Sequence, residues 1–275
     1  GLVTGVQTCA LPILPDTGVY TWHPLEPVRR LSGMADKLCR MTLEGTIARL
    51  WLPGDTRVSR RTMLESLRTQ LDSLAVKEAV RGVLVCGQAG QFCQTAPDDG
   101  MTTSEAAVLA GFGQETLFAL ESLGKPVVAA LTGKITGLGL ELALACSFVL
   151  ADDAACFGFP EIKQGRLPFC GGTQRLTRLV GRAVAKQLLF TGDMISAEEA
   201  LRVRLVNRLY GAAQLESEAL ALLQRICTRS PLALRVGGEV VDAGYDVDLR
   251  TACLLERNAF ALCFASHDQI GRAHV

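Results

Sequence analysis

Apolar runs and amphipathic segments alternate through the first two thirds of the chain, and the last third is amphipathic only. Continuous apolar runs, and one alternating stretch at the start, predict strands at residues 46–52, 80–86, 126–131, 148–151 and 206–210. Apolar positions three or four residues apart predict helices from residue 59, at 104–123, from about 140, at 173–190, after 196, and at 212–228, 231–243 and 248–265. This order predicts an α/β core followed by a helical C-terminal portion.

Helix starts carry their own polar signals. We expect Ser104 to cap the helix at 104–123, because a side-chain oxygen at this place accepts from a free first-turn amide. Ser196 and Glu199 have the spacing of a capping box, in which each residue's side chain accepts from the other's amide.

The stretch 125–176 contains the candidate chemistry. A buried strand at 126–131 leads into a glycine-containing loop and a helix from about Leu140, whose first amides carry partial positive charge. Glu141 is expected in the first turn of this helix, and Glu161 follows Pro160 in a later loop. Apolar surroundings raise a carboxyl pKa toward neutrality, so the two glutamates are candidates for acid–base work.

Composition excludes several classes of protein. The 275 residues include 28 basic and 28 acidic side chains, so nothing suggests a surface for nucleic acid. The longest apolar region, 127–151, is interrupted by Lys134, Glu141 and glycines, which argues against a membrane span. The ten cysteines lack metal-ligand spacing. We therefore expect buried thiols in a reducing compartment, a cytoplasmic protein and no metal site.

The two ends of the chain differ from the rest. Residues 3–13 and 270–275 resemble translated sequencing-library adapters, so we expect 1–13 and 270–275 to be artefacts. The expected organisation between them is an unpatterned segment at 14–42, a core domain at 43–210 and a helical, truncated portion at 211–269.

Five motifs in order resemble the crotonase (enoyl-CoA hydratase/isomerase) superfamily over roughly residues 43–268, most closely enoyl-CoA hydratase. They are KPVVAAL, the GxGxE of 137–141, FGFPEIKQG, GGTQRL and LLFTGDMISAEEAL. The resemblance implies an α/β fold of the crotonase-like (ClpP/crotonase) type, with repeated strand-strand-helix units and a C-terminal helical portion. It also implies an acyl-CoA thioester substrate, no cofactor, and a homotrimer or a dimer of trimers.

The resemblance also implies roles for single residues. Glu161 would protonate the α-carbon and Glu141 would help to deprotonate the attacking water. The amides of Ala96 and Leu138 would form an oxyanion hole for the thioester oxygen. Substrate contacts are implied at Arg57, Val58, Gln94, Pro97, Asp98, Gly137, Pro160 and Phe169. Arg57 is expected near the CoA phosphates, although a loop arginine is more often a solvated charge.

Several residues depart from the family pattern, among them the segment Thr56–Ser59, which is usually Asn-Ala-Leu-Ser. Leu138 and Phe169 stand where glycine is usual, Thr95 replaces another glycine, and Pro97 lacks an amide hydrogen. The phenyl ring of Phe169 is expected to narrow the acyl pocket. The presence of both glutamates favours a hydratase. The alternatives are an enoyl-CoA isomerase, which often needs only the glutamate at the position of Glu161, and a non-catalytic binding module.

Overall fold

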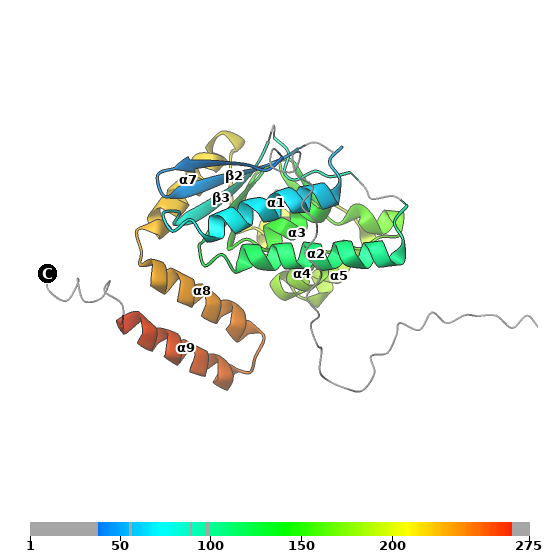
Figure 1. The fold of residues 1–275 in the computed structure, drawn as a ribbon. Coiled ribbons are helices and arrows are strands. Elements are labelled where there is room, and N and C mark those ends of the chain that lie inside the picture. The colour runs from blue at the N-terminus through cyan, green and yellow to red at the C-terminus, as the bar shows by residue number, and fades with distance from the viewer. Residues whose placement is uncertain (1–37, 55–56, 89, 97–99, 266–275) are drawn as a thin grey trace, which may run out of the picture. The chain divides into compact units, whose positions relative to one another are not determined.

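The computed structural model describes residues 38–54, 57–88, 90–96 and 100–265 (Figure 1). These residues belong to one compact unit within Ser32–Val275. Both adapter-like segments and most of the segment 14–42 lie outside the described residues.

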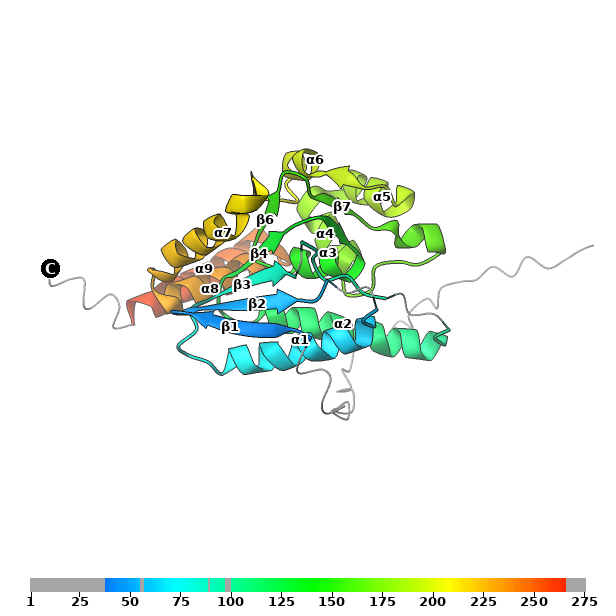
Figure 2. The same cartoon turned by 90° about the horizontal axis from the view of Figure 1, so that it is seen from above.

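The core is built on a six-stranded sheet with the order β1-β2-β3-β4-β6-β9 (Figure 2). Neighbouring strands are parallel except β1 and β2, which pair antiparallel from Arg40 with Trp51 to Glu44 with Ile47. The central strands are continuous apolar runs because both faces of the sheet are covered. The strands are β1 Arg40–Glu44, β2 Ile47–Leu52, β3 Gly82–Gly87, β4 Val127–Leu131, β6 Phe148–Asp152 and β9 Arg208–Tyr210.

A small second sheet lies beside the carboxyl ends of β4 and β6. It contains β5 Lys134–Thr136, β7 Cys156–Gly158 and β8 Ile195–Ser196, in that order. The chain therefore repeats one unit, a strand in the large sheet, a strand in the small sheet and then a helix, as in β4, β5 and α3 (Gly137–Leu144). The predicted α/β core of strand-strand-helix units is confirmed.

Helices cover the large sheet on both faces. α1 (Arg60–Ala75) and α2 (Thr103–Glu121) lie side by side on one face (Figure 1). α7 (Ala212–Cys227) covers the other face, where Leu215, Ala219 and Leu223 pack with outward-facing residues of the strands. In α1 the predicted apolar positions are all buried, namely Met63, Leu67, Leu71 and Leu74. The alternation of strand side chains between two apolar clusters fixes the register of the sheet.

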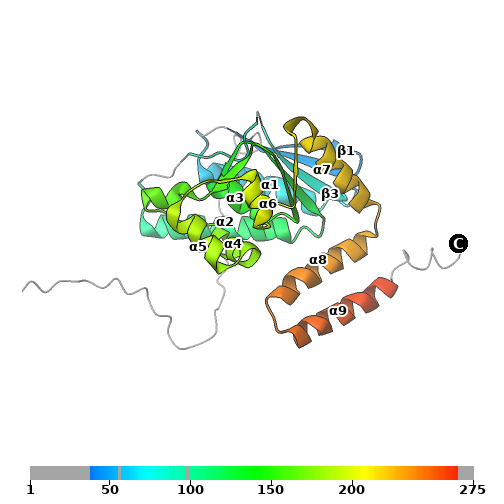
Figure 3. The same ribbon diagram turned by 180° about the vertical axis from the view of Figure 1, so that it is seen from behind.

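Three of the remaining helices lie between β7 and β9 in the chain, and two follow α7. They are α4 Gly172–Val180, α5 Arg182–Thr191, α6 Ala197–Arg202, α8 Pro231–Tyr245 and α9 Leu249–Phe264. α8 and α9 form an antiparallel pair (Figure 3). Large apolar side chains remain exposed on this pair, at Val241, Tyr245, Leu249, Leu254, Phe260, Leu262 and Phe264. None of the helices in the described ranges is long and apolar enough to cross a membrane.

The structure adds one strand that was not predicted and corrects two local predictions. β1 was not predicted, because it is an edge strand in which only Met41 is half-buried and the apolar pattern is absent. The helix predicted at 173–190 is two helices, separated at Gly181 with φ +80°. The cap of α2 is Thr102, two residues before Ser104. Its amide donates to the Glu105 carboxylate at 2.8 Å, in a full capping box.

One of the two hydrogen bonds of the capping box predicted at Ser196 and Glu199 is formed. The Glu199 amide donates to the Ser196 hydroxyl at 3.2 Å. The Glu199 carboxylate does not return to the Ser196 amide, because the Arg202 guanidinium donates to it at 2.6 Å.

Candidate active site

Glu141 lies inside helix α3 and is fully buried. α3 begins at Gly137, earlier than the predicted start near Leu140, because Gly137 adopts φ +52° at the turn out of β5. Glu141 is therefore the fifth residue of the helix, past the first turn, and the first turn contains no acidic residue. The expectation that Glu141 lies in the first turn is wrong, so stabilisation by the helix dipole does not account for it.

Two backbone amides hold the Glu141 carboxyl group. Its Oε1 accepts from the Cys170 amide at 2.6 Å and from the Gly172 amide at 2.8 Å. Its Oε2 is buried and has no hydrogen-bond partner. Burial raises the pKa of Glu141 to about 7, although these amide donors act to lower it and the charge of Glu161 raises it further. The carboxyl group therefore changes its protonation state near neutral pH.

Glu161 comes from the short 3₁₀ turn Pro160–Gln164, and its side chain is half-buried. Burial raises the pKa of Glu161, and the nearby Arg60 guanidinium opposes the shift. Glu161 Oε2 is buried without a hydrogen-bond partner. The α-carbon of Gly137 lies against the carboxyl group, since a β-carbon built there would collide with Glu161 Oε1. Glu161 therefore lies against the first residue of α3, and Glu141 is the fifth residue of the same helix.

The predicted oxyanion-hole residues come from two segments. Leu138 is the second residue of α3, where helix amides have no partner within the helix. Its side chain is 2% exposed and packs in the main apolar cluster, so the leucine finds room without a glycine. The Ala96 amide donates to the Val58 carbonyl at 2.7 Å. An oxyanion role for Ala96 therefore requires this bond to open.

The other predicted substrate residues differ in burial and in the contacts that they make. The Phe169 ring is half-buried and lies 5.5 Å from the Arg60 guanidinium. The Gln94 side chain donates to the Lys134 carbonyl at 2.7 Å, which fastens its loop to β5. Arg57 is exposed, and Pro160 is half-buried at the start of the 3₁₀ turn. The predicted contacts at Pro97 and Asp98 lie outside the described residues.

Among the described residues of the loop before Ala96, one non-glycine residue has a left-handed backbone, Cys93 at φ +48°. Thr95 does not have a positive φ, so the strain expected from threonine in place of glycine does not arise. Close packing accompanies Cys93, because a β-carbon at Gly139 would lie 2.9 Å from the Phe92 carbonyl oxygen. The loop therefore fits tightly against α3.

Sequence reasoning missed Arg60 and the amide donors of Cys170 and Gly172. Arg60 faces Glu161 and Phe169 from the first residue of α1. Its position directly after the helix cap Ser59 was a weak signal. The amide donors of Cys170 and Gly172 gave no signal, because every residue except proline has a backbone amide and the sequence does not show which acceptor it contacts. A β-carbon at Gly172 would lie 2.7 Å from Glu141 Cγ, so glycine is required for this approach.

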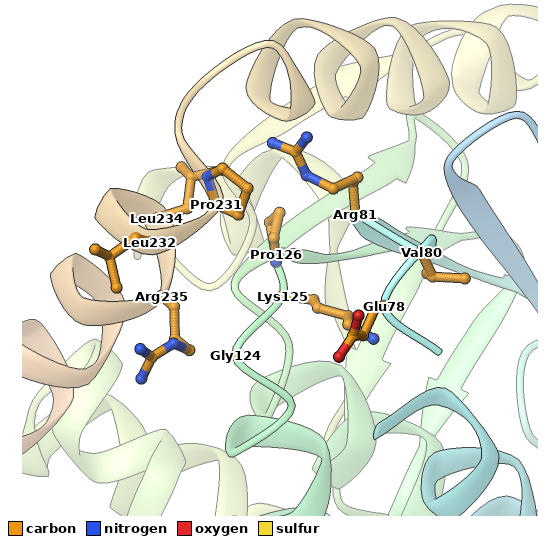
Figure 4. A pocket seen from close by; sticks show the side chains of 10 residues that line it. All are labelled: Glu78, Val80, Arg81, Gly124, Lys125, Pro126, Pro231, Leu232, Leu234 and Arg235. Carbon is orange, nitrogen blue, oxygen red and sulfur yellow. The ribbon is translucent and has the colours of Figure 1, made fainter. Parts of the chain in front are cut away.

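Two pockets of the described residues lie away from the glutamates. One of about 330 Å³ is lined by Glu78, Val80, Arg81, Gly124–Pro126 and the start of α8 (Figure 4). The other, of about 300 Å³, lies between α8 and α9. Within the described ranges no cluster of histidine, cysteine or acidic residues is arranged to hold a metal ion.

Comparison with known proteins gives concordant matches. The family model described as enoyl-CoA hydratase/isomerase matches residues 59–273. A crotonyl-CoA hydratase of Syntrophomonas wolfei is 36% identical over 216 residues, 77% of this chain and 83% of the relative. A short-chain-enoyl-CoA hydratase of Clostridium acetobutylicum is 40% identical over 169 residues, 62% of this chain and 65% of the relative. A solved enoyl-CoA hydratase subunit I of Geobacillus kaustophilus is 33% identical at a TM-score of 0.80, covering 86% of this chain and 93% of that chain.

The fold is therefore of the crotonase class, as the sequence motifs predicted. The chain belongs to the enoyl-CoA hydratase/isomerase family of enzymes.

Proposed function

We propose that the chain catalyses the reversible addition of water to the double bond of a 2-enoyl-CoA thioester. The observation that carries this proposal is the pair of carboxyl groups in which the buried Glu141 has a pKa of about 7 and lies near the half-buried Glu161. Such a pair suits a reaction that needs one proton acceptor and one proton donor at neutral pH. The names of the relatives, crotonyl-CoA hydratase and short-chain-enoyl-CoA hydratase, support the substrate class.

The proposed reaction assigns one step to each carboxyl group. Ionised Glu141 accepts a proton from water as the water oxygen bonds to the β-carbon, and the double-bond electrons move toward the thioester carbonyl. Protonated Glu161 then gives its proton to the α-carbon. One water is consumed and one hydroxyacyl-CoA forms, and proton return from Glu141 to Glu161 through solvent resets the pair. Negative charge develops on the thioester oxygen, and backbone amides stabilise it.

We assign that stabilisation to the amides of Leu138 and Ala96. Leu138 supplies an amide in the first turn of α3, three residues before Glu141. Ala96 supplies the second amide once its bond to the Val58 carbonyl opens. A substrate thioester oxygen would replace the Val58 oxygen as the acceptor. This places the acyl group between the loop at 92–96 and the start of α3.

The test of the proposed function is a comparison of two reactions with the full 275-residue chain. Crotonyl-CoA hydration and 3-enoyl-CoA isomerisation are followed at equal enzyme concentration. The hydration product is identified by the added mass of one water, and the isomerisation product, whose mass is unchanged, by the absorbance of the conjugated 2-enoyl thioester. We expect hydration to exceed isomerisation. Isomerisation in excess would identify an isomerase, and CoA-ester binding without either reaction would identify a binding module.

The proposal includes an assembly and a location. We propose a homotrimer or a dimer of trimers, supported by the apolar side chains that remain exposed on α8 and α9. The mass in solution by light scattering tests it, and a monomer at assay concentration contradicts it. Hydration is expected to need no metal or redox cofactor, so dialysis against a chelator should leave the rate unchanged. A cytoplasmic location stays a prediction, since some relatives are named as mitochondrial.

Replacing Phe169 by glycine should shift substrate preference toward longer or branched acyl chains. The half-buried ring packs near the glutamates, between Arg60 and Gly113, so its removal opens volume without changing charge. The measurement is the ranking of kcat/KM over acyl-CoAs of increasing length. The control is Phe190→Ala, which removes an exposed ring near the end of α5. An unchanged ranking in Phe169→Gly would remove this ring from the acyl pocket.

A further inference from the structure

One face of helix α2 contacts the backbone that holds Glu141. Gln114, Phe118 and Glu121 are spaced four and three residues apart, which places them on one side of a helix. Each of them contacts either the segment 169–171 or Arg175 of α4, which reaches back to that segment. The reaction assigned above makes no use of these residues.

Gln114 holds one end of a peptide group whose other end faces Glu141. Its Nε2 donates to the Phe169 carbonyl at 3.0 Å. The amide on the same peptide group belongs to Cys170 and donates to Glu141 Oε1 at 2.6 Å. A trans peptide is planar, with its carbonyl and its N–H pointing in opposite directions. Fixing the carbonyl therefore fixes the direction of the amide.

Arg175 holds the next peptide group, which joins Cys170 to Gly171 between the two donors to Glu141. Its Nη1 donates to the Cys170 carbonyl at 2.7 Å. Its Nε and Nη2 donate to the two carboxylate oxygens of Glu121 at 2.6 and 2.7 Å, and its guanidinium lies 5.2 Å from the Phe118 ring centre. The Arg175 side chain is only 13% exposed. Its orientation is therefore determined by three contacts at once.

Gly171 shows how closely Arg175 approaches. The residue has φ +94°, and a β-carbon built on it would collide with Arg175 Nη1. The guanidinium thus occupies the place of a side chain at Gly171, directly before the Gly172 amide that donates to Glu141. Both donors to Glu141 belong to a turn in which the Phe169 and Cys170 carbonyls accept from the side chains of Gln114 and Arg175.

We propose that Gln114 and the Glu121–Arg175 pair are positioning residues, which orient the peptides of segment 169–172 so that their amides hold the Glu141 carboxyl group. None of the three residues contacts Glu141 directly. Their effect on catalysis rests on the proposed function, whereas their effect on Glu141 does not.

The proposal has a measurable electrostatic consequence. The charge of Glu161 acts on Glu141, and Glu141 acts in turn on the Cys170 thiol. The other charged or titratable groups that act on Cys170 are Cys93, Arg175 and Arg60. The amide donors lower the pKa of Glu141 against the larger effect of burial. Loss of donor alignment should therefore raise the pKa of Glu141 further. Arg175→Lys keeps the positive charge but cannot make the forked contact, so such a change would come from geometry.

The experiment titrates the Glu141 carboxyl carbon by NMR in the full chain, with its signal assigned by its loss in Glu141→Gln. Arg175→Lys and Gln114→Ala are compared with the wild type and with Arg178→Lys. Arg178 lies on the same helix but pairs with Asp246 at 3.3 Å, so it serves as a matched control. We expect the titration midpoint to move to higher pH in the first two variants and to stay in place in the control.

Activity adds a second measurement. If the wild type hydrates enoyl-CoA, the two variants should lose between about 10-fold and about 10²-fold in kcat at pH 7, because small displacements of a catalytic group have effects of this size. KM should change little, and part of the loss should be recovered at higher pH. A wild type without hydration would contradict the proposed function while the titration still decides the positioning role. Unchanged titration in Gln114→Ala, an exposed position expected to fold even if Arg175→Lys does not, would overturn the inference.

Discussion

Replacing Glu141 by glutamine should lower the hydration rate by at least about 10²-fold, the usual contribution of a general acid–base group. Glutamine keeps an oxygen that accepts from the Cys170 and Gly172 amides, so the local backbone should remain in place. It cannot accept a proton from water. The loss should therefore appear in kcat, with CoA-ester affinity retained.

Glu161→Gln should have an effect of similar size for a different reason, because the α-carbon loses its proton donor. Any isomerase activity should also fall further in Glu161→Gln than in Glu141→Gln. Steady-state rates on the best 2-enoyl-CoA and the affinity for a saturated acyl-CoA are the two measurements. Glu218→Gln, an exposed change on α7, is the matched control and should behave as the wild type. Wild-type turnover in either variant would show that its glutamate takes no part in the reaction.

Gly137→Ala should lower kcat by about 10²-fold, because a displaced catalytic group loses rate on that scale. Gly137 has φ +52°, and an added β-carbon would collide with Glu161 Oε1. The alanine must therefore move the Glu161 carboxyl group or the start of α3. It should also destabilise the fold by about 1 kcal/mol or more, the cost of a non-glycine residue in this backbone region. Activity and the thermal midpoint are measured on the same preparation.

The control for this prediction is Gly238→Ala in α8. Gly238 is helical and exposed, and a β-carbon there would have no heavy atom within 4 Å. Alanine should raise stability slightly at this place, because it is the better helix former. If Gly137→Ala retains full activity, then neither Glu161 nor the start of α3 is held as tightly as the structure indicates.

Most of the fold could be predicted because buried positions are occupied by apolar residues at the spacing of a strand or a helix. The central strands of the large sheet are apolar on both faces, and α1 repeats its apolar residues at helical spacing. The short strands β5 and β7 could not be found in this way. Each has three residues, too few to show a period, and their pairing joins segments about twenty residues apart.

The residues of the candidate site also fall into two groups, those that the sequence pattern indicates and those that only contacts in the fold reveal. Glu141 and Glu161 could be found from the sequence, since a carboxylate in an apolar stretch is conspicuous. Arg60 and the Cys170 amide could not be found, because their roles come from contacts between distant segments. The same limit applies to Ala96. Its motif predicted a free donor, whereas the structure pairs its amide with Val58.

The burial of Glu141 also links protons to folding. Its pKa is 4.5 before burial and about 7 in the folded chain, so folding takes up a proton between these two values. The contribution of Glu141 to the free energy of unfolding is fully present below pH 4.5, and it is lost as the pH rises through about 7. The total loss is on the order of 3 kcal/mol, since each pKa unit corresponds to about 1.4 kcal/mol. The ionised form of Glu141 that the reaction needs is thus the form that the folded chain tolerates least.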